Sequence, residues 1–415
     1  MWPDKIAVKN MPDRPAFFQP DGGIQKPSEF IKTLMHQFED EKIDERTGQR
    51  LTRRLTTDQV LFLAQFAKAC DVVWEEEYQV RFHNKKRKHC RCFNMLLTGE
   101  GGTGKTAIIQ EIVLPATDFI FDVSDPDARP ALIVCAKWSQ ADNISTLTHK
   151  AVSCHRAGMI GVQKYTVDKM KTKGKTTALK RMWAERRVLI LEEVSMIGAP
   201  LYNMLLYRAW AGRAELWEVP FESWAHPDAL FGRMPIVIHL GDFLQLKPTG
   251  CNLSLISSLE QLAISNPDQE IEIDYQRAMR LFCRMPLCFE LTESNRFKDA
   301  RLRDLMTFMR NPKDKLPDDI KQNWEHICAK PDDPRLRQEN FVDGHMMGIY
   351  WDTVSRWMNM RAARDAQVYN VPLYWIQAAD RVDKAMDIQT AAKMLNVANP
   401  KHTGTSHAPL HRLLY

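Results

Sequence analysis

Short apolar runs alternate with stretches of helical character over much of the chain. Five apolar runs are candidates for buried strands, at residues 92–97, 131–136, 188–191, 234–240 and 288–291. The stretches between them predict helices at residues 107–113, 139–152, 201–210, 255–264 and 275–284. This alternation favours a parallel sheet wound with right-handed crossover connections. The predicted fold class is therefore α/β.

The chain before this pattern is less regular. Prolines and a glycine pair punctuate its beginning, so residues 1–50 are expected to be a loosely ordered segment. Within it, the spacing of apolar residues over 28–41 predicts one amphipathic helix. A further helix is predicted to start after the capping residues Thr57 and Asp58 and to cover residues 59–66.

The pattern predicts two domains. A first α/β domain is expected over residues 51–300. Residues 301–340 contain NPKDKLPDD and KPDDP, which is typical of a connector. Residues 341–415 resume strand-like and helix-like patterns and are expected to begin a second α/β domain without completing its sheet.

The first strand and helix enclose the sequence GEGGTGKT at residues 99–106, which matches the phosphate-binding pattern G-x-x-x-x-G-K-T. Glycines let the backbone wrap closely around phosphate oxygens, and the helix N-terminus faces the anion. The lysine reaches the β- and γ-phosphates and the threonine hydroxyl binds Mg²⁺. The expected nucleotide-binding residues are Gly99, Gly101, Gly102, Thr103, Gly104, Lys105 and Thr106.

Two carboxylates follow the strand at 188–191. Glu192 and Glu193 stand at its carboxyl end, where α/β proteins bind ligands. Hydrolysis of a nucleoside triphosphate needs one carboxylate near Mg²⁺ and one that orients or deprotonates the attacking water. Neighbouring residues at the end of a strand can supply both roles. The alternative is an acidic start of a helix.

Three more polar residues fit the same chemistry. Gln245, after the strand at 234–240, is positioned to sense the γ-phosphate, and Arg296, after the last strand, to stabilise its charge in the transition state. The alternatives are a polar loop and a surface ion pair. Gln59 lies on the helix before the loop and is a candidate for pairing with adenine; the alternative is a solvated helix side chain.

Composition limits the class of protein. The chain has 415 residues, 44% of them hydrophobic and 26% charged, as expected for a globular protein of two or three domains. Its net charge of +5 permits a nucleic-acid partner without requiring one. Nine cysteines without a C-x-x-C pair favour a reducing compartment. No apolar run approaches a bilayer span and no secretory signal is present, so we expect neither a membrane nor a secreted protein.

Two basic segments are interpreted as exposed. Residues 83–91 (HNKKRKHCR) favour a solvated loop before the first strand; the alternatives are a nuclear signal or a loop that contacts phosphate. Residues 164–180 are rich in Lys and Thr and predict an exposed loop or short helices. Neither segment by itself assigns a function.

The motifs together resemble the PIF-type (petite integration frequency) DNA helicases, which are RecD-like members of superfamily 1B. The resemblance is strong over roughly residues 50–300, where it implies a RecA-like P-loop NTPase domain. It is weak over residues 341–415, where it implies the start of a second RecA-like domain. Six features carry it in chain order: Gln59, GEGGTGKT at 99–106, THKAV at 148–152, LILEEVSMIG at 189–198, GDFLQLKP at 241–248 and LTESNRF at 291–297.

The resemblance implies an activity and a role for each matched residue. It implies ATP hydrolysis with Mg²⁺, coupled to 5′-to-3′ movement on single-stranded or forked DNA, in DNA repair, recombination or telomere maintenance. Lys105 and Thr106 would hold phosphate and Mg²⁺, Glu193 would be the catalytic carboxylate, and Gln59 would read adenine. Gln245 and Arg296 would read the γ-phosphate. Thr148 and His149 would lie in a motif that contacts single-stranded DNA.

The chain departs from the family in two respects. Glu192 stands where the family usually has Asp, which lengthens the side chain by one methylene and keeps the charge. The chain also ends before the family's last motifs. We therefore expect the front portion of a helicase, which binds ATP with Mg²⁺ and unwinds poorly or not at all.

Two other functions remain open. One is a non-catalytic, nucleotide-switched module that binds single-stranded DNA, and the other is a different P-loop enzyme such as a nucleotide kinase, in which Gln245 and Arg296 have no evident use. Stimulation of ATP hydrolysis by single-stranded DNA separates the first from a helicase. We expect a monomer, located in the nucleus or mitochondrion of a eukaryote or otherwise in the cytoplasm.

Overall fold

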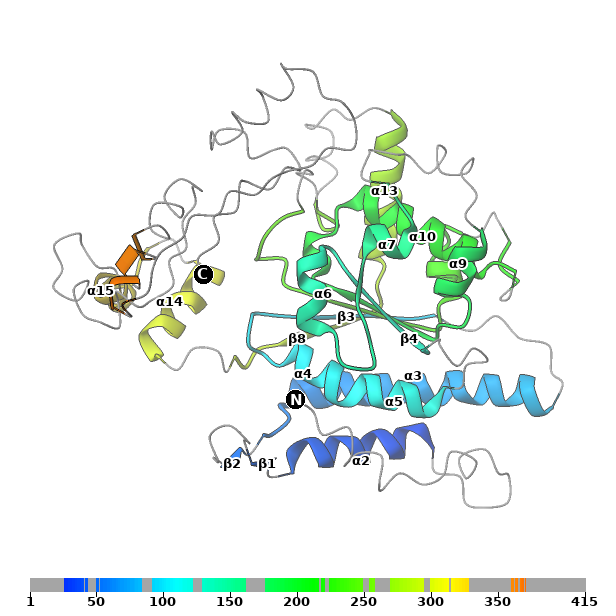
Figure 1. Cartoon of the computed structure of the whole chain (residues 1–415), viewed down its shortest axis with the longest axis horizontal. Helices are drawn as coiled ribbons and strands as arrows, with labels where there is room; N and C mark the ends of the chain where they lie inside the picture. The colour runs from blue at the N-terminus through cyan, green and yellow to red at the C-terminus, as the bar shows by residue number, and fades with distance from the viewer. Residues whose placement is uncertain are drawn as a thin grey trace. The chain divides into compact units, whose positions relative to one another are not determined.

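The computed structural model describes most of the first three quarters of the chain (Figure 1). The described residues are 26–40, 42–43, 50–51, 53–83, 92–121, 129–161, 176–215, 218–220, 224–248, 254–257, 269–294, 299–312, 315–327 and parts of 360–370. The chain divides into two compact units, Met1–Asp314 and Lys315–Tyr415. The first unit carries every candidate site residue that the structure describes.

A six-stranded parallel sheet forms the centre of the first unit, which confirms the predicted α/β class. Its spatial order is β5-β4-β6-β7-β3-β8. The strands are β3 (Phe93–Gly99), β4 (Ala131–Cys135), β5 (Val152–Ser153), β6 (Val188–Glu192), β7 (Ile236–Gly241) and β8 (Leu287–Leu291). All five strands predicted from apolar runs are present. A separate pair, β1 (Lys42–Ile43) and β2 (Arg50–Leu51), is antiparallel.

Helices lie on both faces of this sheet (Figure 1). In the first unit they are α2 (Pro27–Glu39), α3 (Thr57–Phe82), α4 (Lys105–Ile108), α5 (Leu114–Ile120), α6 (Trp138–Ile144), α7 (Cys154–Gly158), α9 (Thr176–Trp183), α10 (Ala199–Arg213), α11 (Leu230–Arg233), α13 (Gln269–Cys283) and α14 (Ala300–Arg310). The short turns η3 (Val194–Met196) and η5 (Pro227–Ala229) are 3₁₀ helices. The second unit contains α15 (Asp318–Ile327).

The inner strands β3, β4, β6 and β7 contribute to two hydrophobic cores because their side chains alternate between the faces. On β6, Val188 and Ile190 join one core while Leu189 and Leu191 join the other. The first core packs against α2, α3 and α5, and the second against α7, α9, α10 and α13. A sheet covered on both faces explains why its strands are continuous apolar runs rather than alternating ones.

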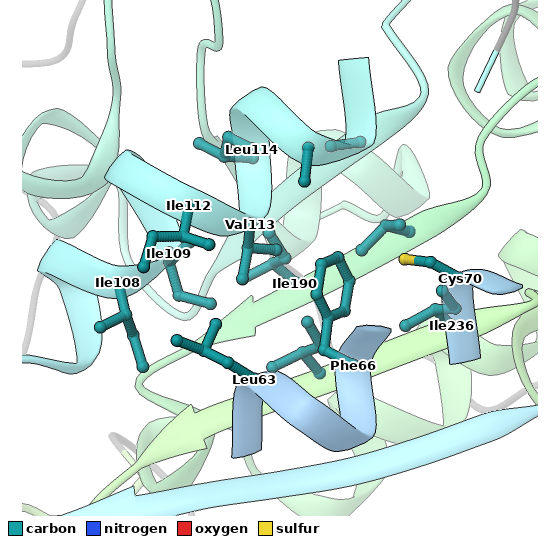
Figure 2. Close-up of a cluster of buried hydrophobic side chains, with 14 of the residues drawn as sticks. Leu63, Phe66, Cys70, Ile108, Ile109, Ile112, Val113, Leu114, Ile190 and Ile236 are labelled. Atoms are coloured by element: carbon teal, nitrogen blue, oxygen red, sulfur yellow. The ribbon is translucent and has the colours of Figure 1, made fainter. Parts of the chain in front are cut away.

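Figure 2 shows the first core, where α3 meets the helix that follows the glycine-rich loop. Leu63 and Phe66 of α3 point toward Ile109 and Val113, and all four side chains are fully buried. Helix α2 packs on the same core through four buried apolar residues, Phe30, Ile31, Leu34 and Phe38. The helix predicted over residues 28–41 is thus confirmed as α2, and it is built into the first unit within a segment otherwise expected to be loosely ordered.

Helix α3 differs from its prediction in its start and its length. Its N-cap is Thr56, whose hydroxyl accepts a hydrogen bond from the Gln59 N–H, and not Thr57 or Asp58. The helix continues for 26 residues to Phe82. Beyond the predicted end at residue 66, Cys70, Val73 and Trp74 are buried in the first core.

The helix after the glycine-rich loop contains a π-helical turn. It runs as α4, then the π-helix Ile109–Val113, then α5. Pro115 stands in the first turn of α5 and has no N–H to donate to the preceding turn, which accounts for the local change in hydrogen bonding. The helix predicted at residues 107–113 is confirmed and extends to Ile120.

Two predicted helices are wrong in part. The stretch 139–152 is helical only to Ile144, because Ser145 turns to extended backbone and the loop that follows is closed by a hydrogen bond from His149 N–H to the Thr146 hydroxyl. The start of the helix predicted at 255–264 is a turn, and its remainder lies outside the described residues. So do the basic segment 84–91, residues 162–175 and most of 341–415. No helix in the described part of the chain is long and apolar enough to cross a membrane.

Candidate nucleotide-binding site

The candidate residues converge at the carboxyl edge of the sheet. The glycine-rich loop follows β3, the two glutamates follow β6, and Asp242 follows β7, and these three strands are neighbours in the order β6-β7-β3. The negative charges of Glu192, Glu193 and Asp242 all act electrostatically on Lys105. Burial lowers the pKa of Lys105, and these carboxylates oppose the shift. The sheet therefore assembles one charged site from three separate segments.

The loop wraps around the Lys105 ammonium. Its Nζ donates to the carbonyl oxygens of Gly99 at 2.6 Å and Glu100 at 2.9 Å. Gly99 has φ +149°, and a Cβ there would lie 2.7 Å from the Leu291 carbonyl oxygen of β8. Only glycine fits this conformation beside the neighbouring strand.

Gln59 supports the loop from behind. It is only 6% exposed, so the interpretation as a solvated helix side chain is wrong. Its Nε2 donates to the Thr103 carbonyl at 2.9 Å, and its Oε1 accepts from the Thr56 N–H at 3.0 Å. A Cβ at Gly104 would lie 2.7 Å from this Nε2. The amide of Gln59 thus joins the cap of α3 to the phosphate-binding loop, and its predicted role in reading adenine stays a prediction.

Glu192 and Glu193 occupy different environments. Burial, reinforced by the charge of Glu193, raises the pKa of Glu192 to about 7, and Lys105 opposes this shift. Its Oε2 is buried and makes no hydrogen bond to the described residues. Glu193 has φ +51° and ψ +49°, a left-handed conformation that is unfavourable for a residue with a side chain. Strained backbone of this kind concentrates at functional sites.

Asp242 organises the loop after β7. It is 2% exposed, and its carboxylate accepts hydrogen bonds from the Leu244 N–H at 3.1 Å and the Gln245 side chain at 3.1 Å. Arg310 of α14 donates to both of its oxygens, at 2.7 and 3.1 Å. Burial alone would raise the pKa of Asp242, but these hydrogen bonds outweigh burial and leave that pKa lowered. The sequence did not point to Arg310.

Arg296 lies outside the described residues, but the chain before it is held at the site. Ser294 donates to the Gly101 carbonyl at 3.1 Å. Thr292 donates from its N–H and its hydroxyl to Asp58 at the start of α3, at 3.3 and 2.8 Å. The segment after β8 is therefore anchored to the glycine-rich loop two residues before Arg296.

Thr148 and His149 lie in the loop between α6 and β5. Thr148 is exposed, whereas His149 is buried, and its Nε2 contacts Asp118 at 3.0 Å. His149 therefore fixes the loop rather than presenting its ring to solvent. Nearby in the sequence, Trp138 at the start of α6 is 57% exposed, with the Arg156 guanidinium 6.0 Å from its ring centre. The sequence analysis had not singled out Trp138.

Known proteins share sequence or architecture with this chain. Residues 86–250 match a family described as an AAA domain, a stretch shorter than half of the chain. A Pif1 helicase from Candida albicans superposes with a TM-score of 0.53 at 19% identity, over 87% of this chain and 63% of that one. The chain shares the fold of this structure over the aligned residues. A Pif1 from Bacteroides bound to single-stranded DNA gives a lower TM-score of 0.42 at 15% identity, over 71% of this chain and 57% of that one.

One curated relative matches in sequence. It is the ATP-dependent DNA helicase RRM3 of Saccharomyces cerevisiae, 27% identical over 175 residues. These residues make up 42% of this chain and 20% of the yeast protein. The chain thus matches only about a fifth of the length of this curated relative.

Proposed function

We propose that this chain is the ATPase part of a PIF-type DNA helicase, which hydrolyses ATP with Mg²⁺ to move 5′-to-3′ along single-stranded DNA. The observation that carries the proposal is the convergence of Lys105, Glu193 and Gln245 at one edge of the sheet. A phosphate-binding loop alone indicates only that a triphosphate binds. The carboxylate and the amide beside it are the groups that hydrolysis of that triphosphate requires.

Each residue has a distinct task in this proposal. The loop N–H groups and Lys105 bind the phosphates, whose oxygens replace the carbonyls that now accept from the Lys105 ammonium. Glu193 orients and deprotonates the attacking water. Gln245 and Arg296 contact the γ-phosphate, and Gln59 keeps the loop in its binding conformation.

The residues fit a magnesium ion. The Glu192 Oε2 atom lacks a hydrogen-bond partner among the described residues, and a bound cation stabilises the ionised form of a buried carboxyl group in that state. Thr106, in the first turn of α4, and Glu192 would hold the ion directly or through water. When bound, Mg²⁺ neutralises charge on the β- and γ-phosphates.

Single-stranded or forked DNA is the proposed partner. Thr148 is exposed in the segment after β4, and Trp138 offers an aromatic face with Arg156 beside it. Aromatic rings stack on bases whatever their sequence, and cations follow the phosphates. The same proposal includes action as a monomer and a role in DNA repair, recombination or telomere maintenance. It places the protein in the nucleus or mitochondrion of a eukaryote, or otherwise in the cytoplasm.

The test measures ATP hydrolysis by the purified chain with and without single-stranded DNA. The proposal expects Mg²⁺-dependent hydrolysis that DNA stimulates, and Lys105→Ala, which removes the cation from the phosphates, as an inactive control. Binding of ATP and DNA without hydrolysis would favour the nucleotide-switched module instead. Hydrolysis that DNA does not change would refute the helicase assignment, and unwinding substrates with opposite single-stranded tails test the polarity.

A further inference from the structure

Arg310 connects three parts of the nucleotide site. It is the last residue of α14, and its Nη1 and Nη2 donate to the two oxygens of Asp242 in a paired geometry. Its Nε lies 3.9 Å from the Glu100 carboxylate in the glycine-rich loop. One guanidinium therefore joins α14, the loop after β7 and the phosphate-binding loop.

The pair with Asp242 involves a deeply buried carboxylate. Asp242 is 2% exposed, and the Arg310 side chain is 23% exposed. A buried carboxylate is unfavourable without a cation, and a paired arginine both compensates the charge and fixes the carboxylate orientation. The plane of the Asp242 carboxylate is thus set by Arg310.

That orientation passes directly to Gln245. The Asp242 Oδ2 atom that accepts from Arg310 Nη1 also accepts from Gln245 Nε2, at 3.1 Å. Gln245 is exposed and has no other hydrogen bond described for its side chain. Its direction therefore depends on the oxygen that Arg310 holds.

We propose that Arg310 is a positioning residue that aims Gln245 at the terminal phosphate through Asp242 and links α14 to the nucleotide state. The inference rests on the proposed function and deepens it. Because Gln245 reads the γ-phosphate in that function, Arg310 affects binding of a triphosphate more than binding of a diphosphate. Because Arg310 is the last residue of α14, a shift of that helix changes the affinity of the site for ATP.

The test is a double-mutant cycle in nucleotide discrimination. Affinities for AMP-PNP and for ADP, each with Mg²⁺, are measured for the full chain, Arg310→Ala, Gln245→Ala and the double variant. Arg310→Ala should lower the affinity for AMP-PNP about tenfold, as expected when a charge-assisted hydrogen bond is lost. It should lower the affinity for ADP less than about twofold. In the Gln245→Ala background, Arg310→Ala should leave the ratio of the two affinities unchanged, because the residue it positions is absent.

Matched variants separate positioning from folding. Arg303→Ala removes an exposed arginine from the same helix and should bind both nucleotides like the original chain. Arg310→Lys keeps a cation beside Asp242 but loses the paired geometry, so it tests the inference even if Arg310→Ala does not fold. In Arg310→Lys the ratio of AMP-PNP affinity to ADP affinity should fall about threefold, because one of the two hydrogen bonds to Asp242 remains.

Three results would overturn the inference. They are an equal loss of AMP-PNP and ADP affinity, full discrimination by Arg310→Lys, and a loss that persists undiminished when Gln245 is absent. If the original chain bound neither nucleotide, the proposed function would fail and the inference with it. If the chain hydrolysed ATP but the two losses simply added, the inference alone would fail.

Discussion

His239 should make the stability of the first unit sensitive to acid. It lies on β7, three residues before Asp242, and is fully buried among the rings of Tyr202, Phe231 and Phe282. Its Nδ1 donates to the Met95 carbonyl at 3.3 Å, so its Nε2 accepts from the Tyr202 hydroxyl at 3.0 Å. Burial lowers the pKa of His239 from 6.5 to about 3, and the hydrogen bond to the Met95 carbonyl opposes this shift.

The sign and size of the effect follow from this shift. The folded state binds the proton less readily than the unfolded state, so stability is complete above pH 6.5 and declines as the pH falls toward 3. Each pH unit below the unfolded pKa costs about 1.4 kcal/mol. At pH 5.0, 1.5 units below 6.5, His239 alone should lower the free energy of unfolding by about 2 kcal/mol relative to pH 7.5.

The measurement is urea unfolding at pH 7.5 and 5.0, followed by tryptophan fluorescence and circular dichroism. His239→Gln keeps an amide that can bond to Tyr202 and removes the titration. The loss of stability between the two pH values should be smaller by about 2 kcal/mol in this variant. His36→Gln, at an exposed position on α2, is the matched control. Parallel losses in His239→Gln and the original chain would refute the reasoning.

Three further predictions concern the site. Glu193→Gln should retain ATP binding and lose hydrolysis by about 10²-fold; equal hydrolysis, measured as phosphate release, would move the catalytic role to Glu192. Gly104→Ala should weaken nucleotide binding about tenfold or more, because its φ is +84° and the new Cβ would meet the Gln59 amide at 2.7 Å; unchanged affinity in a titration would contradict the packing. Trp138→Ala should weaken binding of single-stranded DNA about tenfold, and Trp138→Phe much less, because the phenyl ring still stacks; equal losses in fluorescence anisotropy would exclude stacking.

Local sequence patterns were sufficient to predict the strands of the sheet and the glycine-rich loop. A strand buried on both faces must be apolar throughout, so each one is visible as an uninterrupted run. The glycine-rich loop is equally local, because its glycines, lysine and threonine act within eight residues. For these elements the tertiary structure adds only the strand order.

Contacts between distant segments were not visible in the same way. Asp242 and Arg310 are 68 residues apart, and no periodicity marks either as a partner of the other. Gln59 has the polarity of a surface residue, and only its bond to Thr103, 44 residues away, explains its burial. Thr148 and His149 were placed in a helical stretch because the pattern does not show that the His149 ring is drawn down to Asp118.

The two glutamates show why a strained residue belongs at this site. Consecutive side chains of an extended strand point to opposite faces of the sheet, so Glu192 and Glu193 in regular β conformation would diverge. The left-handed backbone of Glu193, at φ +51°, ends the strand and breaks this alternation. Both carboxylates then act on Lys105, and the charge of Glu193 contributes to the raised pKa of Glu192. A conformation that costs about 1–3 kcal/mol thus allows adjacent carboxylates to serve one site, where the proposed function assigns Glu192 to a cation and Glu193 to water.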